Sequence, residues 1–300
     1  MSINNRVMQR ARELGLVVPA FNVPYLPMVE PVVRALVDQD AFGFIATARL
    51  EWIKFQARSL AAVYHEYARY RNPAHVSLHL DHVPVIDEDQ QRVDYRPLFE
   101  EALSLGYPSI MVDGSRLDLE ENIRITREVA DMAHQAGAVA EAELGAVLGH
   151  EAGPLPDYAT LFASGKGFTA VDDASRFVNE SGCDWLSVAV GNVHGAIADG
   201  LRDQKKVAAH LQLDHLAQLA EATGIPLVLH GGSGVVQEDV RAGIKRGIAK
   251  INIGTEIRQA YEEGLREGGV QRGQETCYTR TCWVLDEYLG LHGTASQLTQ

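Results

Sequence analysis

The chain has 300 residues, of which 46% are hydrophobic, and a formal net charge of −13. This acidic balance argues against a general affinity for nucleic acid or for anionic membranes, because both carry negative charge themselves. No apolar run approaches the ~20 residues of a membrane span. The length suits two small domains or one α/β barrel. The cysteines are Cys183, Cys277 and Cys282, and their wide spacing favours reduced thiols in a cytoplasmic protein.

Short β-branched runs alternate with longer helical patterns along the whole chain, which is typical of parallel βα units. A polar first helix is expected over residues 1–15, since this stretch lacks the apolar core of a signal peptide. Strands are predicted at residues 16–21, 42–47, 75–80, 109–112, 138–144, 185–190, 226–230 and 248–253. Helices are predicted at residues 26–38, 52–70, 97–105, 119–135, 172–180, 211–223, 237–245 and 255–265.

Eight such units predict a closed (β/α)8 TIM barrel with an additional C-terminal helix. The glycine-rich stretch at residues 268–273 resembles a boundary. We therefore expect a barrel domain over residues 1–266 and a helical extension over residues 267–300. The long glycine-bearing segment 145–169, after the fifth strand, is typical of a lid or binding loop.

Polar residues stand at the C-terminal ends of nearly all the predicted strands, where barrel enzymes keep their chemistry. These residues are Asn22, Thr47, Asp81, His82, Asp113, Glu143, His194, His230 and Asn252. Side chains alternate across a strand, so Asp81 and His82 cannot both point inward along a regular run. We expect this pair where the third strand gives way to a loop.

Three histidines, His82, His194 and His230, arrive from three strand ends. Three imidazoles are the usual protein contribution to a catalytic zinc, which keeps one position open for substrate. Zinc is favoured over magnesium because imidazole nitrogen suits it better. Each histidine alone is more simply interpreted as a hydrogen-bonded histidine beside a turn, and only their combination favours a metal site.

Glycines follow two of these histidines at once, in G-N-V-H-G and L-H-G-G-S-G. Glycine lets backbone N–H groups approach an anion closely, and the loops after strands seven and eight are the customary phosphate site of this fold. The segment N-I-G-T, with Thr255 at the start of a helix, would supply the strand-eight half of this phosphate site. A glycine turn explains L-H-G-G-S-G alone, but its pairing with N-I-G-T favours a phosphate site.

Seven motifs together carry a family resemblance, and they run in order from residue 19 to residue 261. They are V-P-A-F-N, H-L-D-H, S-I-M-V-D-G-S, E-A-E-L-G, G-N-V-H-G, L-H-G-G-S-G and K-I-N-I-G-T. In order and spacing the chain resembles the class II, zinc-dependent ketose-bisphosphate aldolases, which include fructose- and tagatose-bisphosphate aldolases. The resemblance implies an aldehyde-lyase of carbohydrate metabolism and glycolysis, which reversibly cleaves a ketose (bis)phosphate to dihydroxyacetone phosphate and an aldehyde through a zinc-stabilised enediolate.

The resemblance also implies roles for individual residues. His82, His194 and His230 would hold the zinc. Asp81 would move the hydroxyl proton of the cleaved alcohol, and Glu151 on the loop after strand five would move the proton on the dihydroxyacetone phosphate carbon. The family's acidic residues near the metal, which can support a second metal position, correspond to Asp113 and Glu143. A helix cap or a solvated loop charge is the plainer interpretation of each of these acids, most of all for Glu151.

The phosphate of dihydroxyacetone phosphate would be bound by residues at the ends of strands one, six, seven and eight. The candidates are Asn22, Gly195, Gly231, Gly232, Ser233, Asn252, Gly254 and Thr255. In relatives, carbonyls of the same loops bind a monovalent cation, Na⁺ or K⁺. Arg258 resembles an arginine that some relatives lend across a dimer interface, although an ordinary surface arginine is as good an interpretation. A homodimer or homotetramer is expected on these grounds.

The departures from the family pattern fall on the aldehyde half of the site. They are Tyr25, the stretch 47–50, Val83, Pro84 and Gly254. Arg49 could bind an anionic aldehyde or take part in an ion pair. The sequence therefore leaves open which aldehyde is used and with which stereochemistry.

Three other interpretations of the sequence stay open at this stage. A Schiff-base aldolase needs a buried uncharged lysine, and Lys250 is the only candidate on a strand. A metal-dependent barrel hydrolase also uses histidines at strand ends, commonly as an H-x-H pair on the first strand, and His79 does not lie there. A noncatalytic phosphosugar-binding protein would keep the glycine loops without needing Asp81 or Glu151.

Overall fold

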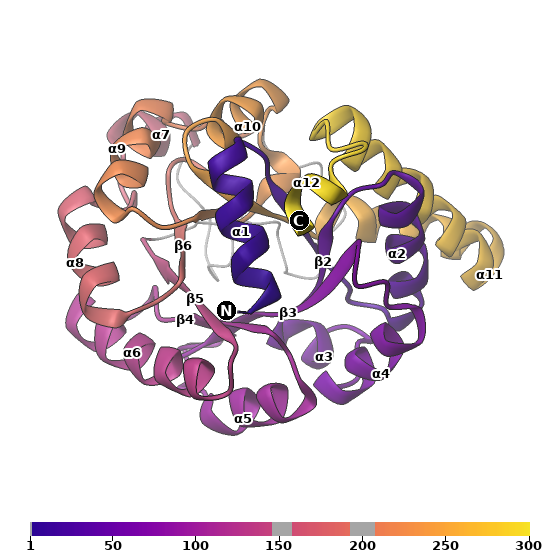
Figure 1. The fold of residues 1–300 in the computed structure, drawn as a ribbon, viewed down its shortest axis with the longest axis horizontal. Coiled ribbons are helices and arrows are strands. Elements are labelled where there is room, and N and C mark those ends of the chain that lie inside the picture. Colours follow the sequence, from indigo (N-terminus) through magenta and orange to yellow (C-terminus); the bar gives the residue numbers. More distant parts are fainter. Residues whose placement is uncertain (1, 146–157, 193–207) are drawn as a thin grey trace.

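In the computed structural model the strands of the chain form one closed parallel barrel, in the order β1 to β8 (Figure 1). The structure describes residues 2–145, 158–192 and 208–300. The strands are β1 (Val18–Asn22), β2 (Gly43–Thr47), β3 (Val76–Pro84), β4 (Ser109–Asp113), β5 (Val139–Leu144), β6 (Trp185–Val188), β7 (Leu227–Leu229) and β8 (Ile248–Ile253). The predicted TIM barrel is thereby confirmed.

Helices surround the barrel and bury its outer face. They are α2 (Val29–Asp38), α3 (Arg49–Ile53), α4 (Leu60–Tyr70), α5 (Arg96–Leu105), α6 (Leu119–Gln135), α7 (Tyr158–Ser164), α8 (Val171–Ser181), α9 (Leu213–Thr223), α10 (Gln237–Ile244) and α11 (Thr255–Trp283). Alternate strand residues such as Leu78, Leu80, Ala140 and Ala142 pack against the apolar faces of these helices. The other half of each strand therefore faces the barrel interior.

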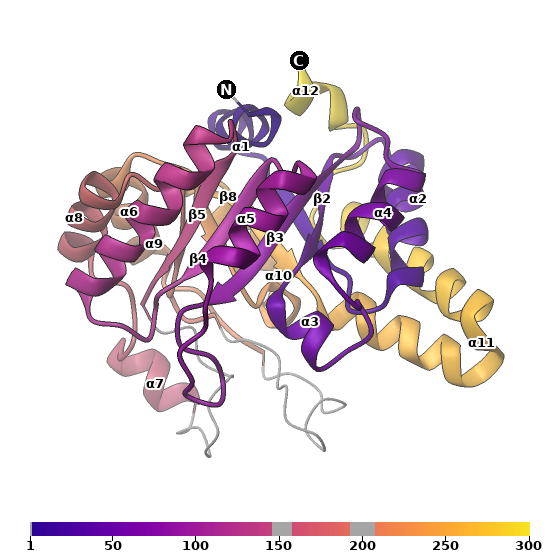
Figure 2. The same cartoon turned by 90° about the horizontal axis from the view of Figure 1, so that it is seen from below.

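The end of the barrel where the strands begin is closed by α1 (Ile3–Leu14) and α12 (Ala295–Thr299) (Figure 2). Met8 and Leu298 belong to one buried cluster with the first inward residues of the strands. Above them Phe44 and Trp185 stack with ring centroids 6.0 Å apart. This apolar lower layer leaves the opposite end for polar residues.

Strand β3 carries a β-bulge at its centre. Leu80 pairs with Ile110 and Val83 with Val112, so three steps along β3 match two along β4. The extra residue lets Asp81 and His82 both face the barrel interior, while the residues on either side of them pack against the helices. The expectation that β3 ends at this pair is wrong, because the strand continues to Pro84.

One helical prediction also needs correction. The helix expected over residues 52–70 is divided into α3 and α4, because the backbone N–H of Gln56 bonds to the carbonyl of Pro24 and Ser59 caps a new helix. The range of α11 consists of two helices joined by a kink, with non-helical angles at Gly268 and Gly269, so its first arm ends close to the predicted residue 265 and its second arm runs to Trp283. Among the described residues, no helix is both long and apolar enough to span a membrane.

Candidate active site

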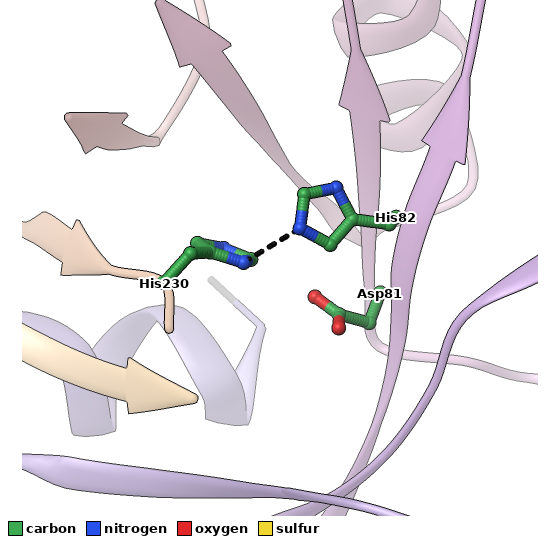
Figure 3. Close-up of side chains that lie close together, drawn as sticks. All are labelled: Asp81, His82 and His230. Atoms are coloured by element: carbon green, nitrogen blue, oxygen red, sulfur yellow. Dashed lines mark hydrogen bonds between the residues drawn. The ribbon is translucent and has the colours of Figure 1, made fainter. Parts of the chain in front are cut away.

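Two histidines meet at the mouth of the barrel, on the side where the strands end. His82 on β3 and His230 directly after β7 lie with Nε2 and Nδ1 2.7 Å apart (Figure 3). Together with Asp81 they form a group whose ligand atoms all lie within 4.8 Å of one another. The structure thus brings together two of the three histidines that the sequence proposed.

Each of the two rings is oriented from behind by a carboxylate. Asp113 Oδ2 lies 3.3 Å from His82 Nδ1, and Glu141 Oε1 lies 2.8 Å from His230 Nε2. The remaining nitrogens of the two rings therefore face each other across the mouth. Convergent ring nitrogens backed by carboxylates are the donor arrangement that zinc sites use, so these residues fit the metal that the sequence predicts.

Asp81 is held by two asparagines from neighbouring strands. Asn22 Nδ2 and Asn252 Nδ2 donate to the same oxygen, Asp81 Oδ2, at 2.7 and 2.9 Å. Burial would raise the pKa of Asp81, but the charges of His82 and Lys250 outweigh it and leave the pKa below its ordinary value. Asp81 is therefore an oriented carboxylate beside the two histidines, with its proton affinity lowered by these charges.

Their surroundings also give the two histidines different pKa values. Burial lowers the pKa of His230, and the nearby His82 lowers it further. His82 is only partly buried, with a side chain 16% exposed, and the hydrogen bond with Asp113 and the charge of Asp81 outweigh this partial burial and raise its pKa to about 10. His82 is therefore the donor in its contact with His230.

Glu143 on β5 lies at the rim of this group. Its Oε2 is 3.9 Å from His82 Nε2 and accepts a hydrogen bond from Ser187 Oγ at 3.2 Å. Burial and the nearby charge of Asp113 raise its pKa to about 8. Glu143, Asp113 and His82 form a second group with ligand atoms close enough to hold an ion.

Below the mouth lies a fully buried polar layer that begins at α1. Asn4 Nδ2 donates a hydrogen bond to Ser109 Oγ. The hydroxyl of Ser109 can then donate its own proton to His79 Nδ1, and Ser109 Oγ lies 2.9 Å from that nitrogen. Burial, with the charge of Lys250, lowers the pKa of His79 to about 3, so the ring is neutral and its proton sits on Nε2. That nitrogen lies 3.5 Å from Glu141.

Lys250 belongs to the same layer and is fully buried. Its Nζ donates to both oxygens of Glu141, at 3.0 and 2.8 Å. A Schiff-base mechanism needs a free amine. An ammonium bonded to both oxygens of a carboxylate does not provide one, so the geometry speaks against that alternative.

The predicted phosphate residues line one side of the mouth. Gly231 has a φ of 71°, and a Cβ on Gly232 would lie 2.4 Å from a side-chain carbon of Ile251, so the loop approaches β8 closely. Ser233 and Thr255 line a common cavity. Gly254 packs against Asn22.

A second cavity borders His82 on the opposite side. Its walls come from the segment after β2, the segment after β3 and the loop after β4, and include Ala48, Leu50, Ile86 and Arg116. Arg49 pairs with Asp87 at 3.5 Å, so the ion-pair interpretation of Arg49 holds in the folded chain. Three of its lining residues, Ala48, Leu50 and Pro84, lie where the sequence departs from the family.

The remaining predicted residues are Glu151, His194, Gly195 and Arg258. Glu151, His194 and Gly195 lie outside the described residues. Arg258 is 6% exposed, donates to Glu262 at 2.7 Å and lies over the ring of Phe55. Its proposed role in a neighbouring subunit stays a prediction.

Sequence reasoning did not name Glu141, and it considered His79 and Lys250 only for other mechanisms, although all three sit one layer below the mouth. Glu141, His79 and Lys250 are spaced two residues from Glu143, Asp81 and Asn252 along their strands. The period of two places each pair on the same inner face. That spacing was a usable signal. Asn192 was also missed, although it lies in G-N-V-H-G, and its Nδ2 donates to the carbonyl of His230.

Comparisons with known proteins agree with this geometry. The sequence profile described as fructose-bisphosphate aldolase class-II matches residues 4–286. Fructose-bisphosphate aldolase from Streptococcus pneumoniae is 35% identical over 269 residues, covering 87% of this chain and 81% of the relative. The fructose-bisphosphate aldolase from Streptococcus pyogenes serotype M1 is 34% identical, again over 87% of this chain and 81% of the relative.

Solved structures give the same result. The YdjI aldolase from Escherichia coli K12 superposes with a TM-score of 0.76 at 26% identity, covering 97% of this chain and 98% of that one. Fructose-bisphosphate aldolase from Campylobacter jejuni, 19% identical with a TM-score of 0.74 over 97% and 96% of the two chains, shares the fold. The protein is therefore a carbon–carbon lyase and belongs to the class II fructose-bisphosphate aldolase family.

Proposed function

We propose that the protein is a zinc-dependent aldolase that reversibly cleaves a ketose bisphosphate, or a related ketose phosphate, to dihydroxyacetone phosphate and an aldehyde. The observation that carries the proposal is Asp81, held by two hydrogen bonds beside two convergent imidazoles. An aldol cleavage needs this combination of a base for the hydroxyl proton and a positive centre for the charge left on the ketone.

The metal would be held by His82 and His230, with His194 from the loop after β6 as the third ligand. When bound, zinc supplies a Lewis acid that stabilises the negative charge developing on the dihydroxyacetone phosphate half. Asp113 and Glu143 would support a second or displaced metal position, as their distances from His82 allow. A monovalent cation, Na⁺ or K⁺, would bind to carbonyls of the phosphate loops.

The residues of the chain would divide the proton transfers between them. Asp81 would take the proton of the substrate hydroxyl during cleavage and return it to the aldehyde oxygen in synthesis. Asn22 and Asn252 fix the carboxylate for this step by occupying its other oxygen. Glu151 would move the proton on the carbon of dihydroxyacetone phosphate.

The phosphate would lie against the glycine loop after β7 and the start of α11. Ser233 and Thr255 support this assignment because they line one cavity together with Gly234. The backbone N–H groups of Gly231 and Gly232, at the start of the same turn, would add donors for the phosphate. Gly195, Asn252 and Gly254 would complete the site. The aldehyde would occupy the cavity beside His82 that includes Leu50 and Arg116.

The setting of the reaction follows from the family. We propose a role in glycolysis-type carbohydrate metabolism in the cytoplasm, as a homodimer or homotetramer in which Arg258 reaches the distal group of a substrate in the neighbouring subunit. No nucleic-acid or membrane partner is expected from the acidic charge of −13.

Replacement of Asp81 tests the proposal directly. We expect Asp81→Ala to lower kcat by about 10²- to 10⁴-fold, because a positioned general base contributes that much. Zinc content, measured by atomic absorption, should stay at the wild-type level. Asp118→Ala, which removes an exposed carboxylate at the start of α6, is the matched control and should keep full activity. Unchanged cleavage by Asp81→Ala would refute the assignment of the base.

The aldehyde is identified by a synthesis panel. Dihydroxyacetone phosphate is offered with phosphorylated, carboxylated and neutral hydroxyaldehydes, and the products are identified by mass spectrometry and NMR. Formation of a ketose phosphate with at least one aldehyde is the expected result. No product with any aldehyde, from a protein that contains zinc, would argue against the proposed reaction.

A further inference from the structure

We propose that Glu141, held in place by Lys250, is a positioning residue for the metal site that fixes the tautomer of His230. The carboxylate of Glu141 would keep the ring proton on Nε2, so that the lone pair of Nδ1 faces the metal position. This inference rests on the proposed zinc-dependent function and adds two residues that do not themselves touch metal or substrate.

The first support is the geometry of the His230 ring. Its two nitrogens have different partners: Nε2 lies 2.8 Å from Glu141 Oε1, and Nδ1 lies 2.7 Å from His82 Nε2. A carboxylate can only accept, so Nε2 must be the protonated nitrogen of a neutral ring. Nδ1 then carries the lone pair and faces the barrel mouth.

The second support is the way in which Glu141 itself is fixed. Lys250 Nζ donates to both of its oxygens, and all three side chains are no more than 1% exposed. The carboxylate therefore cannot rotate away from the ring without breaking a bond to the ammonium. Glu141 sits on β5 and Lys250 on β8, so the ion pair also ties the orientation of His230 to two strands of the barrel wall.

The third support is that packing alone gives no reason for charges at this depth. A buried ion pair is expensive to desolvate, and apolar residues of similar volume often stabilise a core equally well. The layer directly below is apolar, with Phe44 stacked on Trp185. A charged pair at this level is explained by the ring above it, because a carboxylate partner raises the basicity of a ligating imidazole.

The experiment must separate positioning from folding. Glu141→Gln alone leaves the ammonium of Lys250 buried without a counter-charge, and such a protein can fail to fold for that reason. The series is therefore built in a Lys250→Met background, which keeps an unbranched side chain of similar length and leaves no unpaired ammonium. In Lys250→Met alone, the Glu141 carboxylate keeps His230 Nε2 at 2.8 Å and His79 Nε2 at 3.5 Å as neighbours. The three proteins are Lys250→Met alone, Lys250→Met with Glu141→Gln, and Lys250→Met with Glu141→Leu.

Two quantities are measured on each protein, after circular dichroism and thermal unfolding have established that it is folded. Zinc affinity is obtained by competition with a chromophoric chelator, and the ring tautomer of His230 from ¹⁵N chemical shifts of the metal-free protein. Relative to Lys250→Met, we expect zinc to bind about 10-fold more weakly with Glu141→Gln and about 100-fold more weakly with Glu141→Leu. The His230 proton should leave Nε2 in the Leu variant.

The outcomes are separable from a failure of the proposed function. If the wild-type protein bound no zinc, the zinc-dependent reaction itself would be refuted. If the wild-type protein bound zinc and all three variants bound it equally with an unchanged tautomer, only the positioning role of Glu141 would be overturned. A loss of stability with unchanged zinc affinity would also overturn it, since a purely structural ion pair would behave in that way.

Discussion

Glu51 is a buried carboxylate whose raised pKa links the stability of the barrel to pH. It lies on α3, is 7% exposed, and its Oε2 accepts a hydrogen bond from the backbone N–H of Ala48. Burial, reinforced by the charge of Asp81, raises its pKa from 4.5 to about 8. The folded chain therefore holds this proton more tightly than the unfolded chain between these two values.

The sign of the effect follows from proton linkage. A group with a raised pKa in the folded state contributes stability that is complete below pH ~4.5 and is lost as the pH rises through ~8. We expect the wild-type Tm to fall between pH 5 and pH 9, and Glu51→Gln to lose less. Thermal unfolding of both proteins at the two pH values measures the difference. Glu100→Gln, an exposed change on α5, should follow the wild type. Parallel curves for wild type and Glu51→Gln would contradict the assignment.

At the residue scale, the sequence predicted the rim of the site better than its interior. Asp81, His82 and His230 stand at strand ends next to glycines or loops, and such positions are easily recognised. Glu141 and Lys250 lie in the middle of strands, where an apolar residue is the ordinary expectation. Their contacts depend on which strands face each other across the barrel, and a single sequence does not give that geometry.

At the element scale, α11 is a helical hairpin that projects from the barrel (Figure 2). Its two arms pack closely, since Thr276 Oγ1 donates to the carbonyl of Ala260 at 2.7 Å. A Cβ on Gly264 would lie 2.3 Å from Thr276 Oγ1 and 2.6 Å from the carbonyl oxygen of Arg272. The crossing therefore depends on the absence of a side chain at Gly264.

We expect Gly264→Val to lower the free energy of unfolding by about 1 to 3 kcal/mol, because overpacking a tight contact costs that much. Urea unfolding at a fixed pH measures the change. Glu263→Ala, which alters an exposed neighbour on the same arm, should stay within about 0.5 kcal/mol of wild type. Wild-type stability of Gly264→Val would show that the arms separate freely.

The bulge in β3 shows which structural detail a single sequence does not determine. The sequence indicates that Asp81 and His82 cannot share one face of a regular strand, and that inference is correct. It does not indicate whether the chain responds by ending the strand or by bulging. The pairing of Val83 with Val112 beyond the bulge is what continues the strand, and that contact depends on β4.

For the whole molecule, stability and chemistry are placed at opposite ends of the barrel. Apolar residues of α1 and α12 close the end where the strands begin, and the polar group lies where they finish. The alternation of strands and helices was sufficient to predict this closed architecture. It could not predict that α12 returns to α1, because that contact joins segments more than 280 residues apart.

Metal binding should stabilise the entire fold, because His82 on β3 and His230 after β7 approach each other across the barrel. A ligand that binds only the folded state at about 100 times its Kd adds about 2.7 kcal/mol to the free energy of unfolding. For a chain of this size we expect zinc to raise Tm by several degrees and EDTA to reverse the change.

His230→Ala removes one ring of the pair and should abolish the shift, whereas His134→Ala, on the outer helix α6, should keep it. Differential scanning fluorimetry with stepwise zinc addition measures this, and an equal shift in His230→Ala would place the stabilising metal elsewhere.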